Sequence, residues 1–336
     1  MFVSVFRLRL RRGELTGICP ELLARLVMNG RAEGTIKSYE TALKRVWRFG
    51  SKIRTLVFSW GEGELCAFLK DLGCEGLSEG SIKQSLAVVN MTFEAMGKSS
   101  PTKTILVHHV KKAVLKENIK KGKNRDRALM SLRHLDILMR NLFKSPAHKV
   151  PPAERRCLML QLVMFLGMRR FSDIRLLKVK DVNFKQGGAV EFTVGKTKTD
   201  QLGRGSKFVI VGDPKRGFSA SGVIEWYLRS FGLEGEDFLF PCLRGSGKGK
   251  SAVLVKNKAV SYGSALANLQ DVCQVLGLPK LTLHSARIGA CTAGARAGVS
   301  RAYLQACGNW TSSAVDGYVR LEDPGLVFNR AIFRIH

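Results

Sequence analysis

The carboxy-terminal part of this chain contains side chains that could act together on a phosphodiester. His284 and Arg287 are three residues apart, so on a helix they would share one face. Trp310 follows with an indole N–H that can donate a hydrogen bond, and Tyr318 lies eight positions beyond it with a phenol. Such a set could hold a phosphate by positive charge and attack it with an oxygen, without a metal ion.

Transfer of a phosphodiester to a side-chain oxygen makes three chemical demands. A phenol ordinarily has a pKa of about 10, so its proton must be removed as it attacks. Negative charge then grows on the non-bridging oxygens, and the planar guanidinium of arginine matches these oxygens in bidentate geometry. The leaving alkoxide is strongly basic, so a general acid should deliver a proton to it.

Two upstream segments offer the remaining parts. Arg170 precedes Asp173 by three residues, and the segment Gly-Lys-Thr-Lys-Thr at 195–199 offers Lys198 as a proton donor, with Lys196 as its rival. Taken alone, the first segment is an ordinary surface ion pair and the second a solvated turn. It is the order of all these residues along the chain that is hard to obtain by chance.

This ordered set resembles the catalytic residues of the tyrosine recombinase/integrase family, which break and rejoin DNA. The resemblance covers residues 130–325 well, and it is strongest at His-Ser-Ala-Arg, residues 284–287. It implies DNA recombination through a 3′-phosphotyrosine intermediate, with no metal, cofactor or ATP. The residues it assigns are Arg170, Lys198, His284, Arg287, Trp310 and Tyr318, with Asp173 in support.

The resemblance also implies a role for each residue. Arg170 and Arg287 would bind the scissile phosphate, Trp310 would add a hydrogen bond, and Asp173 would hold the first arginine. Tyr318 would attack, Lys198 would protonate the departing oxygen and His284 would assist proton removal. Tyr303, the nearby competitor of Tyr318, is expected to serve packing.

Composition is consistent with a nucleic-acid partner. The chain carries 55 Lys+Arg against 27 Asp+Glu, a formal net charge of +28, which indicates a polyanion such as double-stranded DNA. Eight cysteines without a CxxC pair, and histidines without ligand spacing, favour reduced thiols and no zinc site. No apolar run reaches the roughly 18 residues of a membrane span, so we expect a soluble intracellular protein, nuclear in a eukaryotic host and otherwise in the cytoplasm or nucleoid.

The predicted fold is mainly α with a small antiparallel sheet. We expect an amino-terminal extension (1–32), a helical core-binding DNA-binding domain (33–118), a basic linker (119–128) and a catalytic domain (129–336). The basic stretch that forms the linker begins at residue 111. A first helix from about Thr35 would bury a stripe of apolar side chains along one face. A second helix would start with a capping box at Ser81 and Gln84 and end at Gly97. The two expected stripes are Ile36, Tyr39, Leu43, Val46 and Trp47, and Ile82, Leu86, Val89, Phe93 and Met96.

In the second half we expect a buried helix over 157–166, a hairpin with strands at 190–194 and 208–211, and helices again from about Ser264. Residues 245–251 look like a phosphate-binding loop, but Arg244 occupies the first required glycine position. Because no strand is evident before this segment and no helix after it, we expect a flexible basic loop.

Three functions remain open on sequence. The first is a site-specific recombinase or mobile-element integrase, active as a tetramer on two DNA sites. The short spacing from Trp310 to Tyr318, followed by Val319 and Arg320, resembles that of eukaryotic DIRS and Crypton elements. The others are a type IB topoisomerase and a domesticated DNA-binding protein that no longer cuts. The apolar residues within 324–336 could pack on their own subunit or pass to a neighbour.

Overall fold

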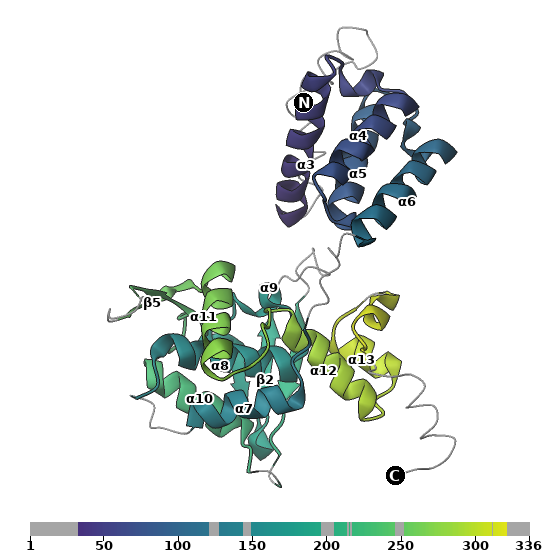
Figure 1. The fold of residues 1–336 in the computed structure, drawn as a ribbon. Coiled ribbons are helices and arrows are strands. Elements are labelled where there is room, and N and C mark those ends of the chain that lie inside the picture. Colours follow the sequence, from purple (N-terminus) through teal and green to yellow (C-terminus); the bar gives the residue numbers. More distant parts are fainter. Residues whose placement is uncertain are drawn as a thin grey trace, which may run out of the picture. The chain divides into compact units, whose positions relative to one another are not determined.

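The structure is a computed structural model that describes residues 33–120, 128–143, 149–195, 205–213, 215, 217–245, 252–310 and 312–320. The chain divides into two compact units, Met1–Asp126 and Arg127–His336 (Figure 1). Within the described residues, no helix is long and apolar enough to cross a membrane. The mainly helical fold with small antiparallel sheets confirms the predicted fold class.

The described part of the amino-terminal unit is helical throughout. Helix α3 packs on α5, and α4 packs on α6. An aromatic cluster of Phe49, Trp60 and Phe68, with ring centroids 5.2 to 5.4 Å apart, lies in its core. The elements are α3 (Glu33–Lys52), η1 (Val57–Ser59), α4 (Glu62–Cys74), α5 (Glu79–Ala95), η2 (Pro101–Lys103) and α6 (Ile105–Lys120).

The predicted stripe of the first helix is partly wrong. Trp47 is 74% exposed, and the buried hydrophobic side chains of α3 are Ala42, Val46 and Phe49. These three follow the i, i+4, i+7 spacing of one helix face, whereas Trp47 is turned by about 100° from Val46 because each residue advances the helix by that angle.

The second helix has the predicted buried face but a different start. Helix α5 begins at Glu79, and its N-cap is Ser78, three residues before the proposed cap, because the Ser78 hydroxyl accepts a hydrogen bond from the Ser81 N–H at 3.3 Å. Ser81 therefore lies inside the helix, and the proposed capping box with Gln84 is wrong. The five predicted core residues of this helix are all buried: Ile82, Leu86, Val89, Phe93 and Met96.

The basic stretch from residue 111 is helical in its first part. Helix α6 continues to Lys120, since Val107 and Val114 on one of its faces are buried in the unit's core. Val114 approaches Gly73 of α4 so closely that a Cβ atom at position 73 would lie 2.7 Å from it. The expectation of a tether starting at residue 111 is therefore corrected, and residues 121–127 lie outside the described residues.

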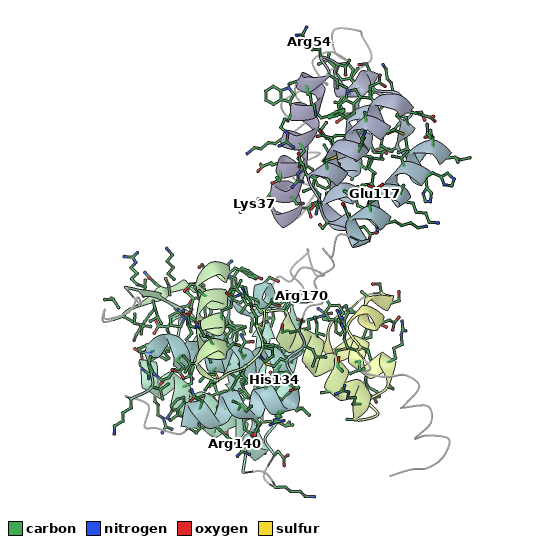
Figure 2. The ribbon with its side chains drawn as sticks, in the orientation of Figure 1. Lys37, Arg54, Glu117, His134, Arg140 and Arg170 are labelled. Atoms are coloured by element: carbon green, nitrogen blue, oxygen red, sulfur yellow. The ribbon has the colours of Figure 1, made fainter. Side chains whose placement is uncertain are left out.

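Helix α8 is the centre of the carboxy-terminal unit. Helices α7, α10, α11 and α12 all contact it, and residues 155–165 are buried, which confirms the predicted buried helix. Helix α7, on which Figure 2 labels His134 and Arg140, begins with reciprocal hydrogen bonds. The Ser131 N–H donates to His134 Nδ1, and the His134 N–H donates to the Ser131 hydroxyl. The helices are α7 (Leu132–Phe143), α8 (Pro152–Leu166), α9 (Phe171–Ile174), α10 (Ala220–Phe231), α11 (Tyr262–Val275), α12 (Ser285–Arg296) and α13 (Arg301–Cys307), with η4 (Val179–Asp181), η5 (Gln186–Gly188) and η7 (Ser313–Gly317).

A three-stranded antiparallel sheet contains the predicted hairpin. Strands β1 (Val182–Phe184), β2 (Val190–Val194) and β3 (Ser206–Ile210) follow one another in that order. Phe192 and Phe208 are opposite each other in register, and their rings stack with centroids 4.8 Å apart. This cross-strand pair fixes the register of the hairpin.

A second hairpin corrects part of the reasoning about residues 245–251. Strand β4 (Pro241–Arg244) leads directly into this segment, and β5 (Val253–Ala259) follows it as the antiparallel partner. A strand does precede the segment, contrary to expectation. Because a strand rather than a helix follows, the phosphate-binding loop remains excluded.

Candidate active site

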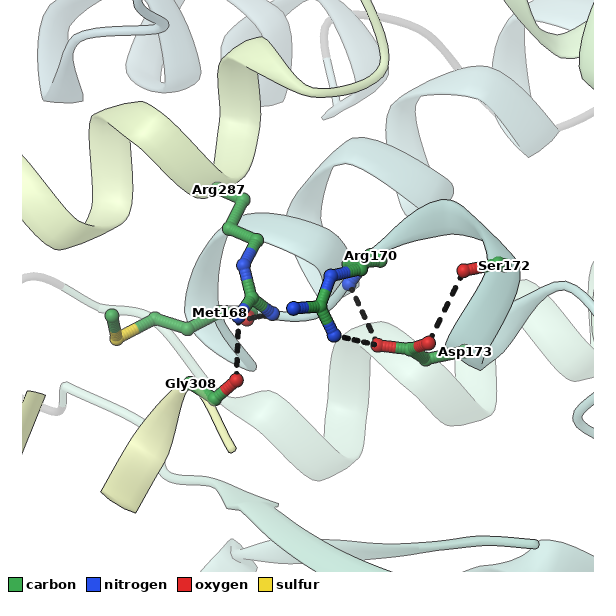
Figure 3. Close-up of polar contacts among 6 residues, drawn as sticks. All are labelled: Met168, Arg170, Ser172, Asp173, Arg287 and Gly308. Carbon is green, nitrogen blue, oxygen red and sulfur yellow. Dashed lines mark hydrogen bonds and ion pairs between the residues drawn. The ribbon is translucent and has the colours of Figure 1, made fainter. Parts of the chain in front are cut away.

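Helix α12 positions the two residues of the strongest sequence motif. His284 immediately precedes the helix, and Arg287 lies fully buried in its first turn. The Arg287 guanidinium donates from Nη1 to the Met168 carbonyl at 2.7 Å and from Nη2 to the Gly308 carbonyl at 2.6 Å (Figure 3). Two segments far apart in sequence thus meet at one guanidinium.

The two carbonyls belong to helix ends of the same kind. At the end of α8, Met168 has φ 49°, and at the end of α13, Asn309 has φ 51°. In each case the next residue donates its N–H back five positions, from Arg169 to Met164 and from Trp310 to Gln305, a pattern that closes many helices. Asparagine tolerates this left-handed conformation better than methionine, so the backbone strain is greater at Met168.

Arg170 lies beside Arg287 and is oriented by a carboxylate. The Arg170 N–H donates to Asp173 Oδ2 at 3.3 Å, and Nη1 of the same residue lies 3.7 Å from that oxygen. The Ser172 hydroxyl donates to the other oxygen of Asp173 at 3.2 Å. Figure 3 shows the Arg170 guanidinium directed toward that of Arg287. The Arg170 side chain keeps 18% of its surface exposed, whereas that of Asp173 keeps 3%.

The electrostatics of this pair favour an anion. Burial, followed by the neighbouring Arg170 cation, lowers the pKa of Arg287 to about 10. The side chain is still charged at neutral pH. Two adjacent like charges, one of them buried, are unfavourable until an opposite charge lies between them.

Two rings flank the Tyr318 phenol, and one of them also lies against the buried cation. The Tyr318 ring lies edge-on to His284, with centroids 5.1 Å apart, and to Trp310, at 4.8 Å. The Arg287 guanidinium lies 3.9 Å from the Trp310 ring centroid and 5.4 Å from that of Tyr318. Gly308 makes this packing possible, because a Cβ atom there would lie 1.8 Å from the Trp310 ring.

Several donors at this place have no acceptor. Among the described residues, Arg170 Nη1, Arg287 Nε and Trp310 Nε1 are buried and make no hydrogen bond. Buried polar atoms are nearly always paired in folded proteins, so a group of unpaired donors indicates a missing acceptor. A phosphate has the oxygens to fill that position.

The structure brings five of the six assigned residues together: Arg170, His284, Arg287, Trp310 and Tyr318. Lys198 and its rival Lys196 lie outside the described residues. Arg169, the neighbour not chosen, is buried, donates from Nη2 to the Lys207 carbonyl at 3.2 Å and stacks 4.8 Å from the Phe208 ring centroid. It thus anchors strand β3, while Arg170 is directed toward Arg287. The assignment of catalytic roles stays a prediction.

Sequence reasoning missed the groups that hold these residues in place. The Met168 and Gly308 carbonyls are main-chain atoms with no side-chain signature, although Gly308-Asn309 after a helical stretch is a usual helix-end signal. Thr292 was also missed: its buried hydroxyl lies within hydrogen-bond distance of the Tyr318 carbonyl, at 3.2 Å. One buried threonine within a helix carries no signal of its own.

Comparison with solved structures identifies the fold. The alignment with the Tn1549 transposon integrase in complex with transposon right end DNA covers 100% of this chain and 100% of the integrase chain. Its TM-score is 0.62 at 12% sequence identity. The XerH site-specific recombinase bound to a palindromic difH substrate gives 0.61 at 15% identity, over 89% of this chain and 80% of that one. A lambda integrase (75–356) dimer bound to a COC′ core site gives 0.59 at 15% identity, over 90% and 93%. The fold is that of the tyrosine recombinases.

Sequence comparison finds one recombinase that is similar to most of this chain. The chain is 26% identical to the recombinase Cre of Escherichia phage P1 over 275 residues, 75% of this chain and 74% of Cre. No family model matches the chain. The chain is thus similar to Cre over three quarters of its length and has the fold of site-specific recombinases, in agreement with the resemblance found in the sequence.

Proposed function

We propose that this protein is a site-specific DNA recombinase or integrase that cleaves and rejoins DNA through a 3′-phosphotyrosine intermediate. One observation supports this above the others: the Arg287 guanidinium, with that of Arg170 next to it, and an unpaired indole N–H lie beside the Tyr318 ring. This arrangement fits a phosphate next to an oxygen nucleophile. The chemistry requires neither a metal nor ATP, because the phosphotyrosine retains the energy of the broken bond.

The two arginines would bind the scissile phosphate. Arg170 Nη1 and Arg287 Nε are the available donors, and Trp310 Nε1 adds a third. As Tyr318 attacks, charge on the non-bridging oxygens increases, and donors already fixed in place stabilise that charge without reorganising. The Met168 and Gly308 carbonyls keep Arg287 fixed, and Asp173 does the same for Arg170.

Proton transfer would involve two further residues. The His284 ring, 5.1 Å from that of Tyr318 between centroids, would assist removal of the phenol proton. Lys198, assigned from the sequence resemblance, would protonate the departing 5′-oxygen, with Lys196 as the alternative. Rejoining reverses these steps with a new 5′-hydroxyl.

The partner would be double-stranded DNA, bound by several copies of this chain. The net charge of +28 suits a polyanion, and solved relatives include a lambda integrase tetramer bound to a Holliday junction, with a TM-score of 0.57 at 14% identity. We propose the same tetrameric state on two DNA sites, inside the cell. The helical unit in residues 33–118 would bind DNA together with the catalytic unit at 129–336, and the basic segment 119–128 would join them.

The test is covalent trapping with matched tyrosine variants. Wild type, Tyr318→Phe and Tyr303→Phe are incubated with nicked duplexes taken from DNA flanking the gene, and quenched in detergent. Tyr303 is the control because it is on neighbouring helix α13 and 71% exposed, so the packing role expected for it from the sequence is wrong. We expect slower-migrating protein–DNA adducts from wild type and Tyr303→Phe, and none from Tyr318→Phe.

Each other result selects a different function. An adduct that persists in Tyr318→Phe contradicts the nucleophile assignment. Absence of adducts from every protein, together with tight binding whose log–log salt slope is about −0.9 per phosphate contact, selects the non-cutting DNA-binding protein. Relaxation of supercoils by a monomer without sequence preference selects the topoisomerase.

A further inference from the structure

Thr292 occupies a buried position on α12, five residues beyond Arg287. Its hydroxyl lies 2.9 Å from the Ile288 carbonyl, one turn back in the same helix, and 3.2 Å from the Tyr318 carbonyl. The same oxygen accepts a hydrogen bond from the Arg320 N–H at 3.1 Å. One side chain therefore contacts the backbone at Tyr318 and two residues beyond it.

We propose that Thr292 is a positioning residue for Tyr318, and this inference rests on the proposed function. A hydroxyl has one proton and two acceptor lone pairs, so it can donate to a carbonyl and accept from an N–H together. The Ile288 carbonyl already receives the helical N–H of residue 292, so it loses little without the hydroxyl. The single hydroxyl proton serves both carbonyls, so the Tyr318 carbonyl loses a shared donor, whereas the Arg320 N–H loses this acceptor entirely.

The position of Thr292 on α12 gives the contact its consequence. Five residues correspond to about 7.5 Å along a helix, so one short rigid element carries both Arg287 and the hydroxyl that holds the Tyr318 backbone. The separation between phosphate and nucleophile is thereby set within a single helix. Displacement of a reacting group by about 1 Å can slow an enzymatic step by about 100-fold.

A second link to the same turn is more exposed. Arg301 of α13 binds Asp316 in bidentate fashion, from Nε to Oδ1 at 2.6 Å and from Nη2 to Oδ2 at 2.8 Å, with both side chains 56% exposed. Exposed ion pairs hold less firmly than buried hydrogen bonds. The Thr292 contact is therefore the stronger constraint on Tyr318.

The amino-terminal unit supplies a matched control. Thr92 of α5 is also fully buried, and its hydroxyl donates to the Val88 carbonyl at 2.9 Å, four residues back. Replacing either threonine with valine removes a buried hydroxyl from a helix, but Thr92 belongs to the other compact unit. A general cost of losing such a hydroxyl should appear in both variants.

The experiment compares Thr292→Val, Thr292→Ser and Thr92→Val in the full chain. Single-turnover cleavage of a nicked duplex is measured beside DNA affinity, with amide hydrogen exchange at residues 318–320. We expect Thr292→Val to slow cleavage on the order of 10- to 100-fold with DNA affinity within about 2-fold, and to accelerate exchange of the Arg320 amide. Thr292→Ser should recover most of the rate, and Thr92→Val should match wild type.

The outcomes separate this inference from the proposed function. Equal cleavage and equal Arg320 exchange in Thr292→Val and wild type overturn the inference, as does a Thr292→Ser variant as slow as Thr292→Val. If wild type cleaves no DNA, the proposed function fails, and hydrogen exchange alone decides whether Thr292 holds this segment. Should Thr292→Val not fold, Thr292→Ala makes the same comparison against Thr292→Ser.

Discussion

Two buried arginines of the carboxy-terminal unit have the same burial and different surroundings. Arg156 of α8 donates from Nη1 to the Pro241 carbonyl and from Nη2 to the Asn268 side-chain oxygen, both at 2.6 Å. It thus joins α8 to β4 and α11. Arg287 donates to two carbonyls as well, but next to it lie a second guanidinium and an indole N–H without an acceptor.

The difference shows that burial of a charge does not by itself mark a functional site. Burial lowers the pKa of both arginines. For Arg156 the neighbouring titratable groups, Tyr227 above all, act in the opposite direction. For Arg287, the Arg170 cation adds to the effect of burial. Groups of the protein itself offset the buried charge of Arg156. The paired charges of Arg287 and Arg170 instead favour an anion bound from outside.

The largest effect should come from Arg287→Lys. Lysine retains the charge but lacks the planar fork, so it cannot hold both carbonyls and a phosphate. We expect cleavage to slow by about 100- to 1,000-fold, or about 2.7–4 kcal/mol of transition-state stabilisation. Single-turnover trapping of the covalent adduct measures this. A variant that cleaves at the wild-type rate would reduce Arg287 to the structural role of Arg156.

Arg156→Met should have an intermediate effect, on stability instead of rate. The substitution leaves the Pro241 carbonyl and the Asn268 oxygen without this donor, while it also removes a charge that is costly to bury. We expect a net loss of about 2–3 kcal/mol, seen as a fall of about 5–10 °C in Tm. Cleavage per folded molecule, measured well below that Tm, should stay unchanged. A tenfold slower cleavage rate at unchanged Tm would contradict the purely structural role of Arg156.

The smallest effect should come from Trp310→Phe. Phenylalanine keeps an aromatic ring beside the Arg287 guanidinium but has no N–H to donate. A hydrogen bond from this neutral donor to a charged phosphate oxygen is worth about 1.5 kcal/mol, so cleavage should slow by about 10-fold. Titration of a tetrahedral oxyanion such as sulfate against Tm gives a second measure, in which Trp310→Phe should gain less stability than wild type.

The sequence predicted elements whose pattern is local. The buried length of α8 and the alternation of β2 and β3 are visible in residue order, and so is the order of Arg170, Arg287, Trp310 and Tyr318 along the chain. The start of α5 was misplaced because Ser78 and Ser81 are both plausible caps, and only the backbone at position 78 decides between them.

Other features depend on tertiary contacts. Trp47 belongs to an apolar stripe in sequence, but the core of that unit is filled from the neighbouring face of α3. The hydrogen-bond partners of Arg287 could not be predicted from the sequence, because they are carbonyls at the ends of two helices more than a hundred residues apart in sequence. The role proposed for Thr292 likewise depends on which segment crosses α12.

Main-chain acceptors have a consequence for how this site could be lost by mutation. A carbonyl is present whatever side chain its residue carries, so no substitution at position 168 deletes the acceptor that Arg287 uses there. Position 308 differs, since any side chain larger than hydrogen would meet the Trp310 ring. Inactive descendants of this gene should therefore carry changes at 287, 308 or 318 far more often than at 168.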